Sequence, residues 1–195
     1  MSDQAPVLDP KRTALLVMDF QQDVLRRLPG LEPLVARVQG AIADMRDHGG
    51  TIGYVRVAFT EEDWAAVPDS AMFAQVARNR LMHHEDPSTA IHDALAPEPG
   101  DIVVRKTRVG AMSTTDLDRQ LRDRGIDTLV LAGISTSGVV LSTVVEATDR
   151  DYRLYVLSDG TEDPDEQVRD VLLGRIFPRR AQIIDTATLR GLLSP

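Results

Sequence analysis

The chain has 195 residues, of which 43% are hydrophobic and 27% are charged, and its formal net charge is −8. This length and composition indicate one folded domain spanning residues 1–195, with the polar residues 1–11 as a loose N-terminal arm. The absence of cysteine excludes disulfides, thiolate metal ligands and a cysteine nucleophile. The negative charge disfavours nucleic acids and anionic membranes as partners. With no signal peptide and no long apolar run, we expect a cytoplasmic protein.

Apolar, strand-like runs alternate with helical patterns along the whole chain. The segment between residues 60 and 100 is the least regular, which is typical of a lid or a binding loop. In chain order, the expected elements are a strand at 13–19, a helix at 31–45, a strand at 51–59, a helix at 71–81, a strand at 101–106, a helix at 116–124, a strand at 128–133, a helix at 137–149, a strand at 152–157, a helix from Asp163, a strand at 181–184 and a short last helix.

This alternation predicts an α/β domain of three layers, Rossmann-like, with a mostly parallel sheet of about six strands and helices on both faces. Ligands of such sheets bind beyond the carboxyl ends of the strands. Asp19, Lys106 and the segment after Gly133 each follow a predicted strand. We therefore expect these three segments to direct polar groups into one crevice that binds a small-molecule substrate.

The two charged side chains at these strand ends are candidate catalytic residues. A partly desolvated Asp19 would have a raised pKa suited to proton transfer, and a neighbouring Lys106 would favour its ionised form and stabilise negative charge on a substrate. The alternatives are that Asp19 caps a loop and that Lys106 forms a structural ion pair or lies at the surface. Arg108 is a candidate for binding a substrate anion.

The turn after the strand at 128–133 is a candidate substrate-binding element. Backbone N–H groups at a helix N-terminus hold an oxyanion well, although the same residues also serve as a capping turn. The run is similar to a Gly-x-Ser-x-Gly nucleophile elbow, but that triad needs a histidine after the serine, and all four histidines precede residue 100. The candidates in this turn are Ser135, Thr136, Ser137 and Gly138.

Neither a metal nor a nucleotide cofactor is expected. Residues 83–86 read His-His-Glu-Asp, which indicates a solvated loop rather than a ligand set, because adjacent residues do not face one another. No Gly-x-Gly-x-x-Gly or Walker A pattern is present.

Four segments in order carry a family resemblance. The chain resembles the isochorismatase-like hydrolases, also called the cysteine hydrolase superfamily, over roughly residues 11–190. The resemblance implies a small-molecule hydrolase without cofactor, and a homodimer or a higher homo-oligomer. The segments are Ala14–Asp23, Val103–Lys106 with Ser113–Leu117, Leu129–Thr143 and Tyr152–Gly160.

The family uses an Asp, a Lys and a Cys, which correspond to Asp19, Lys106 and Val139 of this chain. The nucleophilic cysteine is therefore absent. The resemblance also implies a cis peptide bond between Ile134 and Ser135. Nicotinamidase-type members have a metal-binding Asp-x-His after the second strand, where this chain reads Val57-Ala-Phe-Thr60. True isochorismatases also lack the Cys, and their Asp protonates a vinyl ether before water adds.

We therefore expect Asp general acid/base catalysis without a covalent thioester intermediate, with Gln21 and Phe59 as further substrate-binding candidates. One alternative is a non-catalytic binding or regulatory protein. Another is an amidase or nicotinamidase-type relative with a substitute nucleophile, for which the candidates are Ser135, Ser137 and Ser142. An expected exposed apolar face on the following helix also favours an oligomer; its residues are Val139, Val140, Val144 and Val145.

Overall fold

The computed structural model describes residues 8–28 and 30–193. A sheet of six parallel strands in the order β3-β2-β1-β4-β5-β6 forms the middle layer, as predicted. Its strand order reverses between β1 and β4, the place where open α/β sheets bind ligands. The strands are β1 (Thr13–Met18), β2 (Thr51–Val57), β3 (Ile102–Lys106), β4 (Thr128–Ile134), β5 (Arg153–Glu162) and β6 (Gln182–Ile184).

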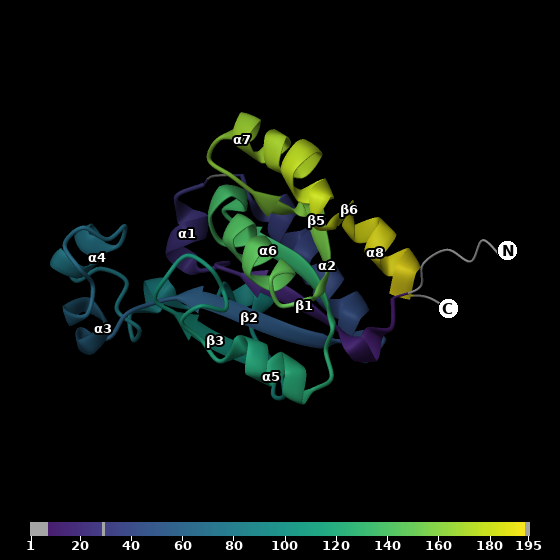
Figure 1. Cartoon of the computed structure of the whole chain (residues 1–195), viewed down its shortest axis with the longest axis horizontal. Helices are drawn as coiled ribbons and strands as arrows, with labels where there is room; N and C mark the ends of the chain where they lie inside the picture. The colour runs from purple at the N-terminus through teal and green to yellow at the C-terminus, as the bar shows by residue number, and fades with distance from the viewer. Residues whose placement is uncertain (1–7, 29, 194–195) are drawn as a thin grey trace, which may run out of the picture.

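Helices cover both faces of this sheet (Figure 1). One core lies between the sheet and α5, α6 and η5, and the other between the sheet and α2 and α8. The α-helices are α1 (Gln22–Arg26), α2 (Glu32–Asp47), α3 (Glu61–Ala65), α4 (Ala74–Arg78), α5 (Leu117–Asp123), α6 (Leu141–Thr148), α7 (Glu166–Val171) and α8 (Thr186–Leu193). Short helical turns are η1 (Pro10–Arg12), η2 (Pro87–Thr89), η3 (Asp93–Leu95), η4 (Thr136–Val140), η5 (Leu172–Ile176) and η6 (Phe177–Arg179).

The central strands are apolar because helices cover both of their faces. Every residue of β1 and of β4 is buried, which accounts for their unbroken apolar sequences. Strand β5 extends to Glu162 instead of ending at Leu157, because its pairing with β4 shifts register between Leu131 and Gly133 and then continues.

Helix α7 begins later than predicted. Its N-cap is Asp165, whose side chain accepts hydrogen bonds from the N–H groups of Gln167 and Val168. Asp163, where this helix was expected to begin, instead accepts a hydrogen bond from the backbone N–H of Ser137. Two aspartates near this helix start are both good caps by sequence, and a contact across the fold decides between them.

Residues 60–100 include a small lobe at the carboxyl end of the sheet, where α3 and α4 stand apart on the left of Figure 1. It has its own apolar cluster around Phe59 and Trp64. A capping box between Thr60 and Asp63 starts α3. Helix α4 is confined to Ala74–Arg78 and is shorter than predicted.

Residues 1–7 of the expected N-terminal arm lie outside the described residues. Leu8 is buried, and its N–H donates to the carbonyl of Leu192, so this part of the arm packs against α8. Both ends of the described chain lie on the right of Figure 1, opposite the α3–α4 lobe. Across residues 8–28 and 30–193, no helix is both long and apolar enough to cross a membrane.

The expected apolar face of the helix after β4 is mostly internal. Val139, Val140 and Val144 are buried in the chain's own core, and of the four valines only Val145 is exposed. The interpretation of these valines as an oligomer surface was therefore wrong, because they pack against the sheet. An oligomer stays a prediction that rests on the family resemblance.

Candidate active site

Asp19 and Lys106 meet at the carboxyl ends of β1 and β3. The Lys106 Nζ lies 2.7 Å from the Asp19 Oδ2, and the two side chains are 2% and 9% exposed. Asp19 leaves the strand with a φ of 61°, and its N–H donates to the carbonyl of Val55 on β2. This left-handed conformation is uncommon outside glycine but tolerated by Asp. It turns the chain out of the sheet at the residue that carries the carboxylate.

Burial determines the acidity of Asp19. Desolvation raises its pKa to about 6, and the neighbouring Lys106 ammonium opposes part of that rise. The second carboxylate oxygen, Oδ1, is buried and has no hydrogen-bond partner among the described residues. A buried polar atom without a partner is costly, which makes Oδ1 a candidate for contact with a ligand.

A cavity of about 540 Å³ opens above this pair. Its wall is mostly apolar, apart from Asp19, Lys106, Arg27 and Ser135, and it includes Met72 and Phe73 of the α3–α4 lobe. Such a lining suits a small ligand with an apolar body and few polar groups. The remaining wall residues are Val24, Leu28, Val57, Val109, Ile134, Gly138, Val139 and Pro164.

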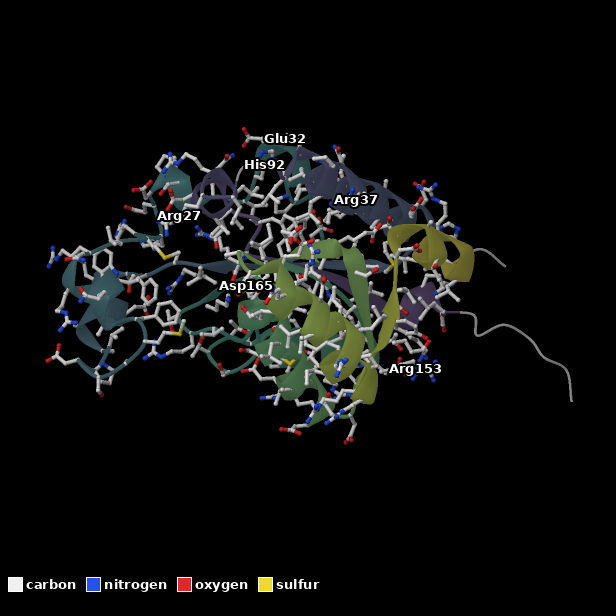
Figure 2. All side chains as sticks on the ribbon, turned by 90° about the horizontal axis from the view of Figure 1, so that it is seen from above. Arg27, Glu32, Arg37, His92, Arg153 and Asp165 are labelled. Atoms are coloured by element: carbon white, nitrogen blue, oxygen red, sulfur yellow. The ribbon has the colours of Figure 1, made fainter. Side chains whose placement is uncertain are left out.

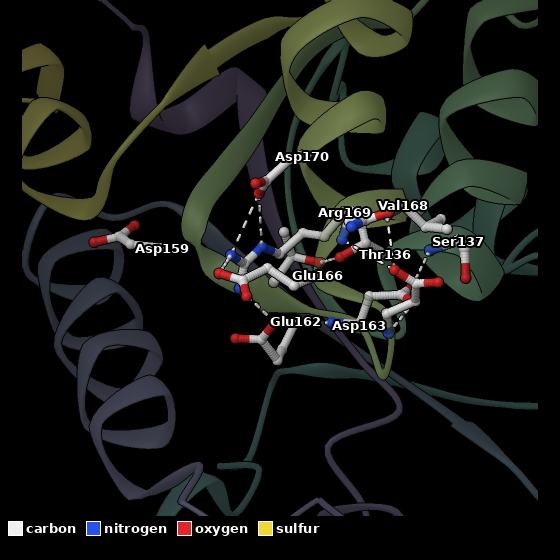
Figure 3. A network of polar contacts seen from close by, with 12 residues as sticks. Thr136, Ser137, Asp159, Glu162, Asp163, Glu166, Val168, Arg169 and Asp170 are labelled. Carbon is white, nitrogen blue, oxygen red and sulfur yellow. Dashed lines mark hydrogen bonds and ion pairs between the residues drawn. The ribbon is translucent and has the colours of Figure 1, made fainter.

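The turn between β4 and α6 forms one side of the cavity. The peptide bond between Ile134 and Ser135 is cis, as the resemblance implies. The Gly138 N–H donates to the Ser135 side chain at 3.1 Å, and a Cβ at Gly138 would collide with that hydroxyl. The Ser137 N–H donates to the Asp163 carboxylate at 2.7 Å (Figure 3). Two of the N–H groups expected to hold an oxyanion are therefore already engaged within the protein.

Val139 stands where the family resemblance puts the nucleophile. It lies in η4, a single wide helical turn that leads into α6, and the residue is 2% exposed while still lining the cavity. Its two methyl groups offer the cavity an inert apolar surface beside Ser135.

Five predicted substrate-binding residues lie outside the cavity wall as described. Gln21 is fully buried, and its amide bonds to the backbone of Val57 and Thr89, so it supports a wall residue from behind. Phe59 is also fully buried and packs on Phe73, another wall residue.

The other three of these five residues have partners within the protein. Thr136 is fully buried and hydrogen-bonds Thr161 on β5. Arg108 is half-buried and donates to the carbonyl of the adjacent Thr107. Ser137 is exposed and contributes only the N–H that Asp163 accepts.

Arg27, at the end of α1, is a cavity residue that sequence reasoning missed. In Figure 2 it lies between the α3–α4 lobe and the rest of the molecule. Its guanidinium pairs with Asp23, a carboxylate that Arg26 also contacts, so two cations share one anion at the mouth of the cavity. Nothing in the sequence marks Arg27, because the run Arg26-Arg27 resembles any polar helix end.

The donor set of the cavity bears on metal binding. Asp19 is the single carboxylate on the described wall, no histidine lines it, and the Lys106 ammonium already contacts Asp19. A cation at Asp19 would therefore have to displace Lys106. His83, His84 and Glu85 do offer ligand atoms within 4.8 Å of one another, but none of the three is among the residues that line this cavity.

A Rossmann-like sheet with an acid–lysine pair at the switch point defines the class of this domain. A family model described as the Isochorismatase domain matches residues 13–188. The ureidoacrylate amidohydrolase RutB of Methylobacterium radiotolerans is 34% identical over 176 residues, covering 79% of this chain and 68% of the relative. Maleamate amidohydrolase of Pseudomonas putida is 30% identical over 166 residues, covering 80% and 76%.

The solved structure of an isochorismatase family protein from Burkholderia thailandensis superposes with a TM-score of 0.82 at 29% identity, covering 96% of this chain and 98% of the other. The chain belongs to the isochorismatase family of hydrolases.

Proposed function

We propose that this protein is a cysteine-independent hydrolase of a small molecule, in which Asp19 is the general acid. The observation that carries the proposal is the unpartnered Oδ1 of Asp19, a buried carboxyl oxygen with a pKa of about 6, at an apolar cavity. A carboxyl group with this pKa still holds its proton in about one tenth of molecules at pH 7. A general acid works best when its pKa lies near the working pH.

The chemistry that fits these residues is the hydrolysis of an activated bond such as a vinyl ether. Protonated Asp19 delivers its proton to the alkene carbon, and the resulting oxocarbenium ion takes up water. The hemiketal then collapses to a ketone and an alcohol, and a water proton returns to Asp19. Lys106 stabilises the carboxylate that forms between these steps. An unactivated amide is a harder substrate for this site, because Val139 supplies no nucleophile.

A substrate screen in D₂O tests this reaction. We expect turnover of a small-molecule vinyl ether. We expect no turnover of two matched compounds in which an amide or an ester replaces the vinyl ether. Protonation at carbon leaves one deuterium on the new methyl group of the ketone at early times, whereas hydrolysis of an amide leaves none. Turnover of the amide alone would favour the amidase alternative. Ligand binding without turnover of any of the three would favour a binding protein.

The second prediction concerns covalent chemistry at residue 139. Wild-type protein is expected to resist iodoacetamide and to show no mass adduct during turnover. Val139→Cys introduces the chain's single thiol near a helix start, in the wall of the cavity that Lys106 also lines, and both a helix start and a nearby cation lower a thiol pKa. We therefore expect its alkylation to follow a pKa below the usual value of about 8.5.

Val145→Cys is the matched control, because it lies on the exposed face of α6. Its alkylation should follow an ordinary thiol pKa. A mass adduct on wild-type protein during turnover, mapped to Ser135, would contradict the non-covalent mechanism and assign a serine nucleophile.

The substrate class follows from Arg27. The two relatives described above are named for ureidoacrylate and maleamate, both of which are acids. Arg27 has guanidinium donors at the cavity mouth, and it shares Asp23, its one anionic partner among residues 8–28 and 30–193, with Arg26. We propose that the substrate has an apolar body and a carboxylate, and that the carboxylate binds Arg27.

Arg27→Ala is the corresponding prediction. It should raise KM for a carboxylate substrate about three- to tenfold, a modest effect because the side chain is solvent-exposed, and leave kcat nearly unchanged. Steady-state kinetics on an acid and on its neutral methyl ester measure the difference, which should vanish for the ester. Arg26→Ala is the control, since Arg26 shares Asp23 but does not line this cavity. An equal KM effect of the two variants would contradict the assignment.

A further inference from the structure

The orientation of Lys106 depends on a carbonyl group in the loop that follows it. An ammonium has three N–H donors, and two of them point to the Asp19 carboxylate at 2.7 Å and to the Val109 carbonyl at 2.6 Å. The loop of residues 107–115, called here the Lys106 loop, carries Val109 and includes no helix or strand. The position of the Lys106 ammonium therefore depends on how firmly the rest of the fold holds this loop.

Helix α6 anchors the Lys106 loop. The Ala111 N–H donates to the Thr143 hydroxyl at 3.2 Å, and the Met112 N–H donates to the Glu146 carboxylate at 2.9 Å. Both acceptors lie on one face of α6, one turn apart. Gly110 packs directly on the Glu146 carboxylate, because a Cβ there would overlap its two oxygens.

The Glu146 side chain has no ion-pair partner within residues 8–28 and 30–193. Its carboxylate therefore acts mainly as the acceptor for the Met112 N–H of the Lys106 loop. We propose that Glu146 is a positioning residue for the acid–lysine pair: through Met112 and Gly110 it fixes the Val109 carbonyl and so holds Lys106 against Asp19. This inference rests on the proposed function for its consequence in catalysis, but the geometry that it predicts exists without substrate.

The test reads the pKa of Asp19 directly, by NMR titration of its carboxyl carbon in protein labelled with ¹³C at aspartate. In Glu146→Leu the loop loses its anchor, Lys106 contacts Asp19 less closely, and the Asp19 pKa should rise by about 0.5 to 1 unit. Glu146→Gln keeps an oxygen acceptor for the Met112 N–H and should restore a value near that of wild type. Gly110→Ala displaces the same carboxylate by steric overlap, so it tests the contact even if the leucine variant fails to fold.

Tyr152→Phe is the control for a general loss of stability. It removes a hydrogen bond of 2.8 Å to Asp118 in the first turn of α5 and leaves the contacts of Val109, Gly110 and Met112 in place. It should lower the melting temperature without moving the Asp19 pKa. An unchanged Asp19 pKa in Gly110→Ala and Glu146→Leu, or equal shifts in the leucine and glutamine variants, would overturn the inference. Because no turnover is measured, this outcome is independent of whether the proposed hydrolysis is correct.

Discussion

Asp19→Asn should lower kcat about 10²- to 10⁴-fold, the usual contribution of general acid catalysis. The amide has no acidic proton near neutral pH, so it cannot deliver one to the substrate. It still presents an oxygen that accepts from Lys106, at the position where the carboxylate lies 2.7 Å from Nζ. We therefore expect folded protein with nearly unchanged substrate binding, measured by steady-state kinetics together with thermal melting.

Asp170→Asn makes the same chemical change at an exposed ion pair on α7, and it should leave kcat unchanged. If Asp19→Asn kept activity within tenfold of wild type while folding normally, Asp19 would not be the general acid. If Asp19→Asn lost activity and its melting temperature also fell sharply, Asp19→Glu would be measured as a second variant, because it keeps the acid group at a changed distance.

Lys106→Met should move the pH profile and lower the limiting rate by about 10²-fold, because the carboxylate formed after proton transfer loses its counter-ion. Lys106 lowers the pKa of Asp19, so its removal raises that pKa above the wild-type value of about 6. The protonated acid is the active form. Wild-type kcat should therefore be highest below pH 6 and fall as pH rises through 6, and in Lys106→Met the fall should begin at higher pH.

The chain contains one other lysine, Lys11, which is exposed, so Lys11→Met is a matched control. Its pH profile should coincide with that of wild type. Lys106→Arg keeps the charge and should keep the profile closer to wild type than the methionine variant does. A profile that Lys106→Met leaves in place would show that the two side chains are not coupled in the reaction.

Much of the fold could be predicted from local sequence, because burial on two faces leaves an unbroken apolar run and burial on one helical face leaves a regular spacing. The runs that became β1 and β4 are of the first kind. The carboxyl ends of parallel strands share one edge of a sheet, so the sequence also predicted that Asp19 and Lys106 would be neighbours, as they are. Where the pattern was weak, as around α4, the predicted bounds were too long.

The sequence by itself determined the α/β architecture, the lack of cysteine among these 195 residues, and the three segments that reach the candidate site. Only the tertiary structure decided how acidic Asp19 is, because its pKa depends on burial by residues far away in the chain. The same holds for Arg27 at the mouth, for Asp163 engaging the Ser137 N–H, and for Glu146 anchoring the Lys106 loop. Periodicity and propensity are local properties of the sequence. A cavity wall and its electrostatics instead arise from contacts between segments that are far apart in the sequence.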